Sequence, residues 1–380
     1  MRNVSILGIG QIPVAKRETA SVGAMAVEAC RRAMVDARVD AVDAVFVGNM
    51  MASEITGQSH LGPLVAAELG DGGCESVMVN AACASGAAAI RQAYLAVASG
   101  EHDTVIAVGV EKMTGTGRSQ ITRLLASAAD YEREVKNHAS FVGLNALLMQ
   151  RYLHQYHLER HDFAKFAEVA HENALANPNA RLRERVTPQI YLNCRMVSDP
   201  IALFDCCPTG DGAAAVVVSK RSRRKNAVHI RGSVSVSDTL SLQERGDPLW
   251  LRAAEESCRD ALRQANRELN EIDFFEPHDA FTIMTVLSLE ACGFAERGRG
   301  TEFAREVGIH LKGGLPLCTA GGLKARGHPV GATGAYQVVE AVQQLRGEAG
   351  PNQLDSPSVA LTQSFGGTAA TVVTHVLERG

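Results

Sequence analysis

Short apolar runs alternate with longer amphipathic segments over the first part of the chain. A short apolar run is typical of a buried strand, and apolar residues three or four positions apart are typical of a helix. The pattern therefore predicts strands at residues 3–8, 43–48, 76–80 and 104–109. It predicts helices at residues 23–38, 61–69 and 83–99. This alternation indicates a parallel or mixed sheet covered by helices, and so an α/β fold.

The chain also repeats itself at long range. Three pairs of segments resemble each other: residues 26–33 and 254–261, residues 83–87 and 328–332, and residues 210–218 and 366–374. The first two pairs are offset by 228 and 245 residues, but the third pair is offset by only 156. A repeat on this scale indicates two related halves. The shorter offset indicates an insertion of about 89 residues within the first half.

We therefore predict two pseudo-symmetric α/β halves and one inserted domain. The first half comprises residues 1–112 and 203–225, the insertion residues 113–202, and the second half residues 226–380. Much of the insertion is rich in His, Arg, Glu and Asn, which distinguishes it from the apolar segments on either side.

Composition excludes several classes of protein. The chain has 380 residues, 46% of them hydrophobic, which is ample for a buried core. A net charge of −4 does not favour nucleic acid, and no apolar run approaches the length of a membrane span. The first residues lack the features of a signal peptide, so we expect a cytoplasmic protein. The nine cysteines are scattered without a CxxC pair, and HExxH is absent, so we expect neither a disulfide framework nor a metal site.

Cys83 is the first candidate for chemistry. An apolar strand is predicted to end near residue 80, and a helix rich in alanine is predicted to start at Cys83. A cysteine at a helix N-terminus lies in a positive field that stabilises its thiolate. A buried core cysteine in the same helix would give the same pattern, so both interpretations stay open here.

His328 is the second candidate. It lies in a segment, residues 321–334, that contains five glycines and so predicts close approach of the backbone. The internal repeat places His328 at the position equivalent to Cys83, so both side chains could face one site between the halves. A cysteine and a histidine are the minimal pair for a thiol nucleophile and its base. A histidine that serves only the turn before Pro329 is the alternative.

Four motifs resemble the active-site loops of the thiolase family, and they occur in the family's order. They are NAACASG at residues 80–86, HDAF at 278–281, GGLKARGHPVGATG at 321–334 and SFGGTAATVV at 364–373. The chain is most similar to the archaeal-type and sterol-carrier-type thiolases. The resemblance covers essentially the whole chain. It implies two βαβαβαββ halves in a five-layered αβαβα body, with a loop domain inserted in the first half.

The resemblance also implies roles for individual residues. Cys83 would take an acyl group from a CoA thioester, and His328 would accept the thiol proton. The backbone N–H groups of Cys83 and Gly366 would form one oxyanion hole. His278 stands where many thiolases have an asparagine that holds a water in the other oxyanion hole. Phe281 and Gly367 would lie beside the substrate.

The chain departs from the family pattern at the second catalytic cysteine. Ser364 occupies the position of that cysteine, and Ala280 occupies the position of the cysteine in relatives with HDCF. A serine hydroxyl is a far poorer base than a thiolate. Cys318 or His278 could replace the missing base. We therefore expect acyl transfer through Cys83, with the base of the second step left open.

The resemblance leaves further expectations open. His138 could line the acyl pocket, or it could be a solvated loop residue. We expect a homodimer or homotetramer that pairs through the edge of the first-half sheet, acyl-CoA as substrate and no cofactor. A small OB-fold partner that presents CoA is a further expectation. The alternatives are a retro-aldolase of the sterol-carrier branch and a non-catalytic acyl-CoA-binding protein.

Overall fold

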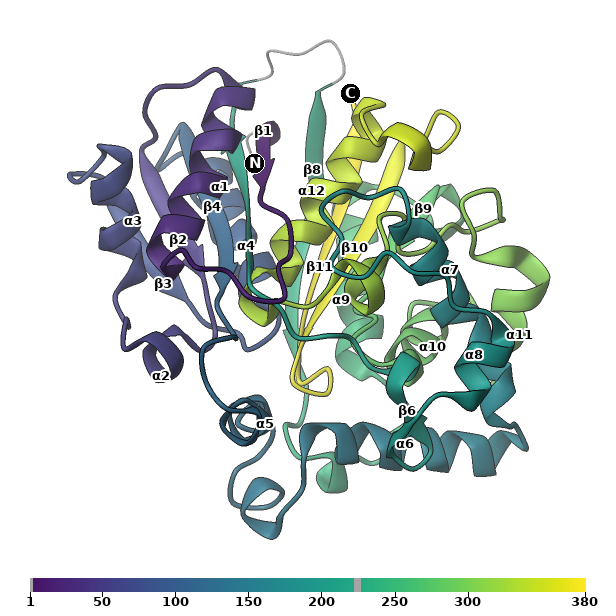
Figure 1. Ribbon diagram of the computed structural model, residues 1–380. Helices are drawn as coiled ribbons and strands as arrows, with labels where there is room; N and C mark the ends of the chain where they lie inside the picture. Colours follow the sequence, from purple (N-terminus) through teal and green to yellow (C-terminus); the bar gives the residue numbers. More distant parts are fainter. Residues whose placement is uncertain (1–2, 222–226) are drawn as a thin grey trace.

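A computed structural model describes residues 3–221 and 227–380, and its central feature is a sheet (Figure 1). Within these residues nine strands join in the order β3-β2-β4-β7-β1-β8-β11-β10-β9. Their bounds are β1 Ser5–Gln11, β2 Ala44–Gly48, β3 Glu75–Val79, β4 Thr104–Glu111, β7 Gly212–Ser219, β8 Val228–Ser237, β9 Phe274–Glu276, β10 Val359–Gly366 and β11 Thr371–Arg379. The predicted strands of the first half are confirmed to within three residues.

The strand order shows the internal symmetry. The two halves meet where β1 pairs with β8 in antiparallel register, Ser5 opposite His229 and Ile6 opposite Val228. Outward from this junction the first half runs β1, β7, β4, β2, β3, and the second half runs β8, β11, β10, β9. Leu317 forms an isolated parallel bridge to Phe275 of β9, so it takes the place that β3 has in the first half. The repeat in the sequence therefore corresponds to a repeat in the fold.

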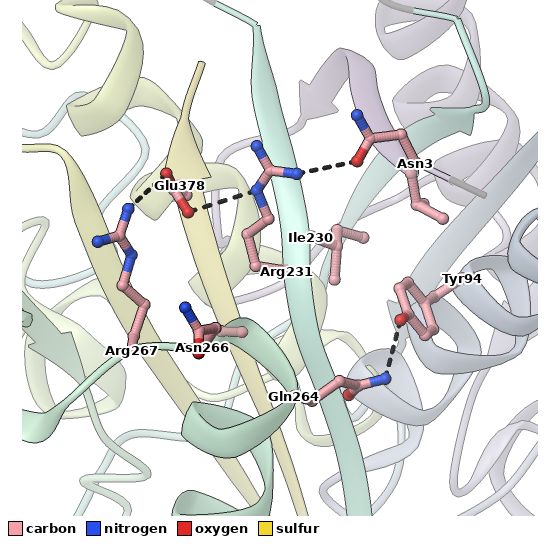
Figure 2. A pocket seen from close by; sticks show the side chains of 10 residues that line it. Asn3, Tyr94, Ile230, Arg231, Gln264, Asn266, Arg267 and Glu378 are labelled. Atoms are coloured by element: carbon pink, nitrogen blue, oxygen red, sulfur yellow. Dashed lines mark hydrogen bonds and ion pairs between the residues drawn. The ribbon is translucent and has the colours of Figure 1, made fainter. Parts of the chain in front are cut away.

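A polar groove of about 530 Å³ lies beside the junction of the halves. Figure 2 shows that Arg231 on β8 forms an ion pair with Glu378 on β11 and donates a hydrogen bond to Asn3. On the other side of the groove, Gln264 donates to the hydroxyl of Tyr94 (Figure 2). These polar side chains therefore use one another as hydrogen-bond and ion-pair partners, and the contacts join the two halves.

Two helices pack together between the halves. They are α4 (Ser85–Ser99) and α12 (Thr333–Arg346), and they contact strands of both halves (Figure 1). Their close approach depends on small residues, because a Cβ atom on Gly334 would lie 2.4 Å from the backbone nitrogen of Ala87. The two helices can therefore pack this closely only because glycine and alanine occupy the contact between them.

Outer helices complete the layers. On the first half α1 (Val22–Ala37) packs on β1 and β7, and α3 (Leu61–Leu69) packs on α1 and β3. On the second half α9 (Arg252–Ala265) packs on β8 and β11. The first-half and second-half strands of the nine-stranded sheet thus form two separate layers, with α4 and α12 between them and the outer helices on either side. This arrangement is the predicted five-layered αβαβα body.

A long segment between β4 and β7 carries most of the remaining elements. It contains α5 (Arg118–Ala126), α6 (Phe141–Tyr156), α7 (Ala164–Ala174), α8 (Pro188–Asn193) and the short strands β5 (Met196–Ser198) and β6 (Ile201–Ala202). It packs on the second half, where α6 contacts α10 (Thr282–Ala291). The buried carboxylate of Glu134 accepts from the N–H of Leu242 at 2.7 Å.

The predicted domain boundaries stay predictions, and the one between residues 225 and 226 lies outside the described residues. The other helices are α2 (Ala52–Thr56) and α11 (Gly300–Phe303). In the described part of the chain, no helix has the length and apolar character needed to cross a membrane.

Candidate active site

Cys83 lies in a tight loop between β3 and α4. The helix begins at Ser85 rather than at Cys83, which corrects the predicted start of the helix. The hydroxyl of Ser85 accepts from the N–H of Ala81 at 2.9 Å and donates to the carbonyl of Ala82 at 2.6 Å. Ala82 has a left-handed φ of 50°, an unusual conformation for a residue with a Cβ atom. The loop therefore holds Cys83 just ahead of the helix, with only 3% of its surface exposed.

His328 lies in the loop that leads into α12, and Thr333 fixes its orientation. Its Nδ1 atom is 2.6 Å from the Thr333 hydroxyl, which also lies 3.2 Å from the carbonyl of Pro329. Since the hydroxyl has one proton and donates it in the hydrogen bond to Pro329, the hydroxyl accepts a hydrogen bond from the Nδ1–H of His328. This arrangement leaves Nε2 of His328 as an acceptor. The N–H of His328 donates to the carbonyl of Pro208 at 3.1 Å and fixes the loop.

The fold brings Cys83, His278 and His328 together. One sulfur or nitrogen atom from each lies within 4.8 Å of the others, and all three residues are buried. The rings of the two histidines meet edge to face, with centroids 5.2 Å apart and planes at 82°. The His278 ring also lies 5.4 Å from that of Phe365, and its Nδ1 atom has no hydrogen-bond partner among the described residues. The equivalence of Cys83 and His328 in the repeat thus corresponds to a shared site.

Burial keeps this cluster uncharged. It raises the pKa of the Cys83 thiol to about 12, and the nearby carboxylate of Glu111 adds to the effect. Burial lowers the pKa of His278 to about 3, with a smaller contribution from the cation of Arg326. Burial, the neighbouring His278 and Arg326 lower the pKa of His328 well below its usual value. These shifts favour a thiol and two neutral imidazoles in the resting site, whereas the field of a helix N-terminus alone would favour a thiolate.

Arg326 is held beneath the histidines by its own partners. Its Nε atom is 2.9 Å from a carboxylate oxygen of Glu340, and both side chains are almost fully buried. Its guanidinium carbon lies 4.7 Å from the centre of the Tyr336 ring. The cation that lowers the pKa of both histidines is thus a fixed part of the core.

Glu111, the last residue of β4, joins two loops near the site. Its carboxylate accepts from the backbone N–H groups of Met50 at 2.9 Å, Met51 at 3.3 Å and Gly331 at 3.1 Å, and from the Asn49 amide at 3.0 Å. Gly331 follows His328 closely in the chain, so this buried carboxylate ties the histidine loop to the first half.

An apolar cavity of about 160 Å³ opens onto Cys83 and His328. Phe281 forms part of its wall, and its ring lies 5.9 Å from that of Phe141. The other residues that line it are Met113, Thr122, Leu125, Val142, Cys206, Cys207, Thr209, Ala280 and Val330. Sequence reasoning did not identify most of this wall, because five of its residues come from the segment between β4 and α7, where no motif marks them.

Gly366 and Gly367 lie at the end of β10 beside the Cys83 loop. A Cβ atom on Gly366 would be 2.4 Å from the carbonyl oxygen of Ala81. Gly367 has a φ of 62°, and a Cβ atom there would be 2.5 Å from the carbonyl oxygen of Ala128. Glycine is therefore required at both positions so that the strand end can touch the nucleophile loop.

Six predicted site residues are not among those that line the cavity in the described part of the chain: His278, Gly366, Gly367, Ser364, Cys318 and His138. The buried hydroxyl of Ser364 donates to the side-chain oxygen of Gln337. Burial raises the pKa of the Cys318 thiol well above its usual value, and the nearby carboxylate of Asp279 adds to the effect. His138 is exposed, so it is placed as a solvated loop residue.

Comparisons with known proteins agree with this architecture. Residues 8–194 match the family model "Thiolase, N-terminal domain", and residues 234–379 match "Thiolase C-terminal domain-like". The chain is 38% identical to an acetyl-CoA acetyltransferase of Methanothermobacter thermautotrophicus, over 100% of both chains. It is 30% identical to the benzoylsuccinyl-CoA thiolase subunit BbsB of Thauera aromatica, over 96% of this chain and 95% of that one. Human sterol carrier protein 2 is 28% identical over 98% of this chain and 72% of its own length.

Solved structures share the fold. An Ltp2-ChsH2(DUF35) aldolase matches with a TM-score of 0.85 and 23% identity, over 99% of this chain and 98% of that one. An acetyl-CoA acetyltransferase from Syntrophomonas wolfei matches with a TM-score of 0.77 and 17% identity, over 100% and 99% of the two chains.

Proposed function

The chain belongs to the thiolase family, and we propose that it transfers acyl groups between CoA thioesters through a thioester on Cys83. The observation that carries the proposal is the convergence of three buried side chains, Cys83, His278 and His328, of which Cys83 and His328 line an apolar cavity. A soft nucleophile, an adjacent base and an enclosed apolar wall are what a two-step acyl transfer requires.

In the first step the Cys83 sulfur attacks the thioester carbonyl. Nε2 of His328 takes the thiol proton, and Thr333 holds the Nδ1–H so that the imidazolium points correctly. The carbonyl oxygen becomes an oxyanion, which we place on the N–H groups of Cys83 and Gly366. The C–S bond to CoA then breaks, and CoA leaves as a thiol with the proton from His328. Acyl-Cys83 and a neutral His328 remain.

The second step needs a base for the α-carbon of the incoming acyl-CoA. We propose His278 for this role, because it is buried and one of its nitrogen atoms lies within 4.8 Å of the Cys83 sulfur. Its unpartnered Nδ1 supports this assignment. Ser364 and Cys318 are less suitable, since the Ser364 hydroxyl is bound to Gln337 and the carboxylate of Asp279 disfavours a thiolate on Cys318. His278 would remove the α-proton, the enolate would attack acyl-Cys83, and the Cys83 thiolate would recover a proton.

We propose a second copy of this chain and a small protein as partners. β3 is an edge strand, and Val77 on it is 43% exposed. An exposed edge strand is a ready site for pairing. The Ltp2-ChsH2(DUF35) aldolase combines a chain of this fold with a DUF35 component, which supports a small partner here as well. Acyl transfer through Cys83 uses no redox or electron-sink group, so we propose that no cofactor is needed. A cytoplasmic location stays a prediction.

Intact mass spectrometry tests the proposal. The purified chain is incubated with acetyl-CoA, acetoacetyl-CoA and longer acyl-CoAs, and we expect an acyl adduct on the parent chain. Cys83→Ala should form none, and Cys74→Ala, which changes a half-buried cysteine on a separate loop, should acylate as the parent does. His278→Asn should form the adduct but lose turnover.

The same experiment separates the alternatives. A retro-aldolase would cleave a β-hydroxyacyl-CoA without forming an adduct on Cys83, and a binding protein would retain acyl-CoA without reacting. An adduct that persists in Cys83→Ala, or no adduct with any of the thioesters, would contradict the proposal.

A further inference from the structure

Cys83, His278 and His328 are also a set of metal-ligating side chains. We infer that the acyl pocket binds a thiophilic divalent cation such as Zn²⁺, held by the Cys83 thiolate and one nitrogen of each histidine, and that the bound cation blocks acyl transfer. The second part rests on the proposed function, since it assumes that Cys83 carries the acyl group. The three ligand atoms already lie within 4.8 Å of one another.

The separation of the three ligand atoms is within about 1.5 Å of that in a zinc site. Zinc lies about 2.3 Å from cysteine sulfur and about 2.0 Å from histidine nitrogen, which places neighbouring ligands ~3.3–3.7 Å apart. Shifts of about 1 Å by the side chains would close the present separation around an ion.

Both histidines are prepared for a ligand. Nδ1 of His278 is a buried polar atom with no hydrogen-bond partner in residues 3–221 and 227–380. Nδ1 of His328 is held by the hydroxyl of Thr333 at 2.6 Å, which leaves Nε2 as the coordinating atom. Metal-binding histidines are commonly fixed through their second nitrogen in this way.

The three donor atoms favour a soft cation over a hard one and leave one position open. One thiolate and two imidazoles prefer zinc to magnesium or calcium. The cavity of about 160 Å³ beside Cys83 and His328 has room for a fourth ligand, either water or the thiol of CoA. On binding, the S–H bond of Cys83 breaks, a sulfur–metal bond forms and the proton passes to solvent. No atom changes oxidation state.

Titration with Co²⁺ tests the inference, because Co²⁺ occupies zinc sites and has visible absorption. The full chain is first freed of metal with a chelator. We expect one Co²⁺ per chain, an ultraviolet thiolate-to-cobalt band, and displacement by Zn²⁺. Cys83→Ala should lose the thiolate band. His278→Asn should weaken Zn²⁺ binding by roughly 100-fold or more, because removing a ligand costs more affinity than removing a residue that only hydrogen-bonds to a ligand. His154→Asn, which changes an exposed histidine on α6, is the matched control and should bind as the parent does.

Competition with acylation links the metal to the reaction. Zn²⁺ should abolish the acyl adduct, a chelator should restore it, and prior acylation of Cys83 should prevent Co²⁺ binding. Binding without the thiolate band, or binding unchanged in both Cys83→Ala and His278→Asn, would overturn the inference. If an adduct forms but no Co²⁺ binds, the metal site fails and the proposed function stands. If Co²⁺ binds but no thioester acylates Cys83, the proposed function fails.

Discussion

Thr333→Val isolates the hydrogen bond that orients the catalytic base. Valine has nearly the shape of threonine, so the change removes one hydroxyl from a buried site. Nδ1–H of His328, now 2.6 Å from that hydroxyl, would keep no acceptor there. Leaving a buried donor unpaired costs about 1–3 kcal/mol. Because His328 becomes an imidazolium during attack, the loss of this hydrogen bond raises the free energy of the transition state more than that of the resting site. Each 1.36 kcal/mol added to the barrier slows the reaction about tenfold. We expect acylation to slow by about 5- to 150-fold.

The assay is rapid-quench intact mass spectrometry of the Cys83 adduct. Thr285→Val is the matched control, since Thr285 is also a buried threonine but its hydroxyl has no partner among the described residues. We expect that control to acylate at the parent rate and to unfold at the same or a higher temperature. If Thr333→Val acylates within about twofold of the parent while remaining folded, Thr333 does not orient the base, and the assignment of the Nδ1 proton fails.

Three further outcomes are expected. The pKa of His328 is well below its usual value, so the base stays neutral, and the acylation rate should show no acid limb with a midpoint near pH 6.5 when measured from pH 8 to 5. Gly366→Ala would place a methyl group 2.4 Å from the carbonyl of Ala81, so loss of the adduct is expected, and parent-like acylation would contradict the packing. Burial raises the pKa of Glu111 from 4.5 to about 7. The folded state therefore binds more protons than the unfolded state between these values, and stability falls by about 3 kcal/mol as pH rises from 4.5 through 7. Glu111→Gln should remove that fall in denaturant titrations.

Much of the fold follows from the sequence because two signals reinforce each other. The alternation of apolar runs and amphipathic segments marks strands and helices, and it places α1 and α3 within one residue of their observed bounds. The internal repeat then relates the two halves, and it predicts that Cys83 and His328 share a site, as the structure shows. Equivalent loops of two pseudo-symmetric halves meet at the axis that relates them. The repeat therefore predicts which residues far apart in the sequence lie close together, and local patterns of apolar residues do not.

The sequence could not reveal the cavity wall or the charge state of the site. Leu125 and Phe141 reach the cavity through the packing of the inserted segment on the second half, and no periodicity encodes that contact. The expected thiolate rested on the field of the helix N-terminus. In the structure α4 begins after Cys83, and burial outweighs that field. Ser364 occupies the motif position of a catalytic base, but its hydroxyl is directed to Gln337.

A neutral resting site explains how such an apolar pocket can perform ionic chemistry. A buried thiolate would need a permanent partner, because an unpaired charge in a low dielectric is costly. Here the thiol and the imidazoles of His278 and His328 are all uncharged at rest, and Arg326 is balanced by Glu340. Charge forms only when the proton of Cys83 moves to His328 as the sulfur attacks, and the leaving CoA thiol removes it. Charge separation therefore occurs only near the transition state, where oriented N–H groups stabilise the oxyanion. At rest the pocket carries no charge on these three groups and can accept an apolar acyl chain.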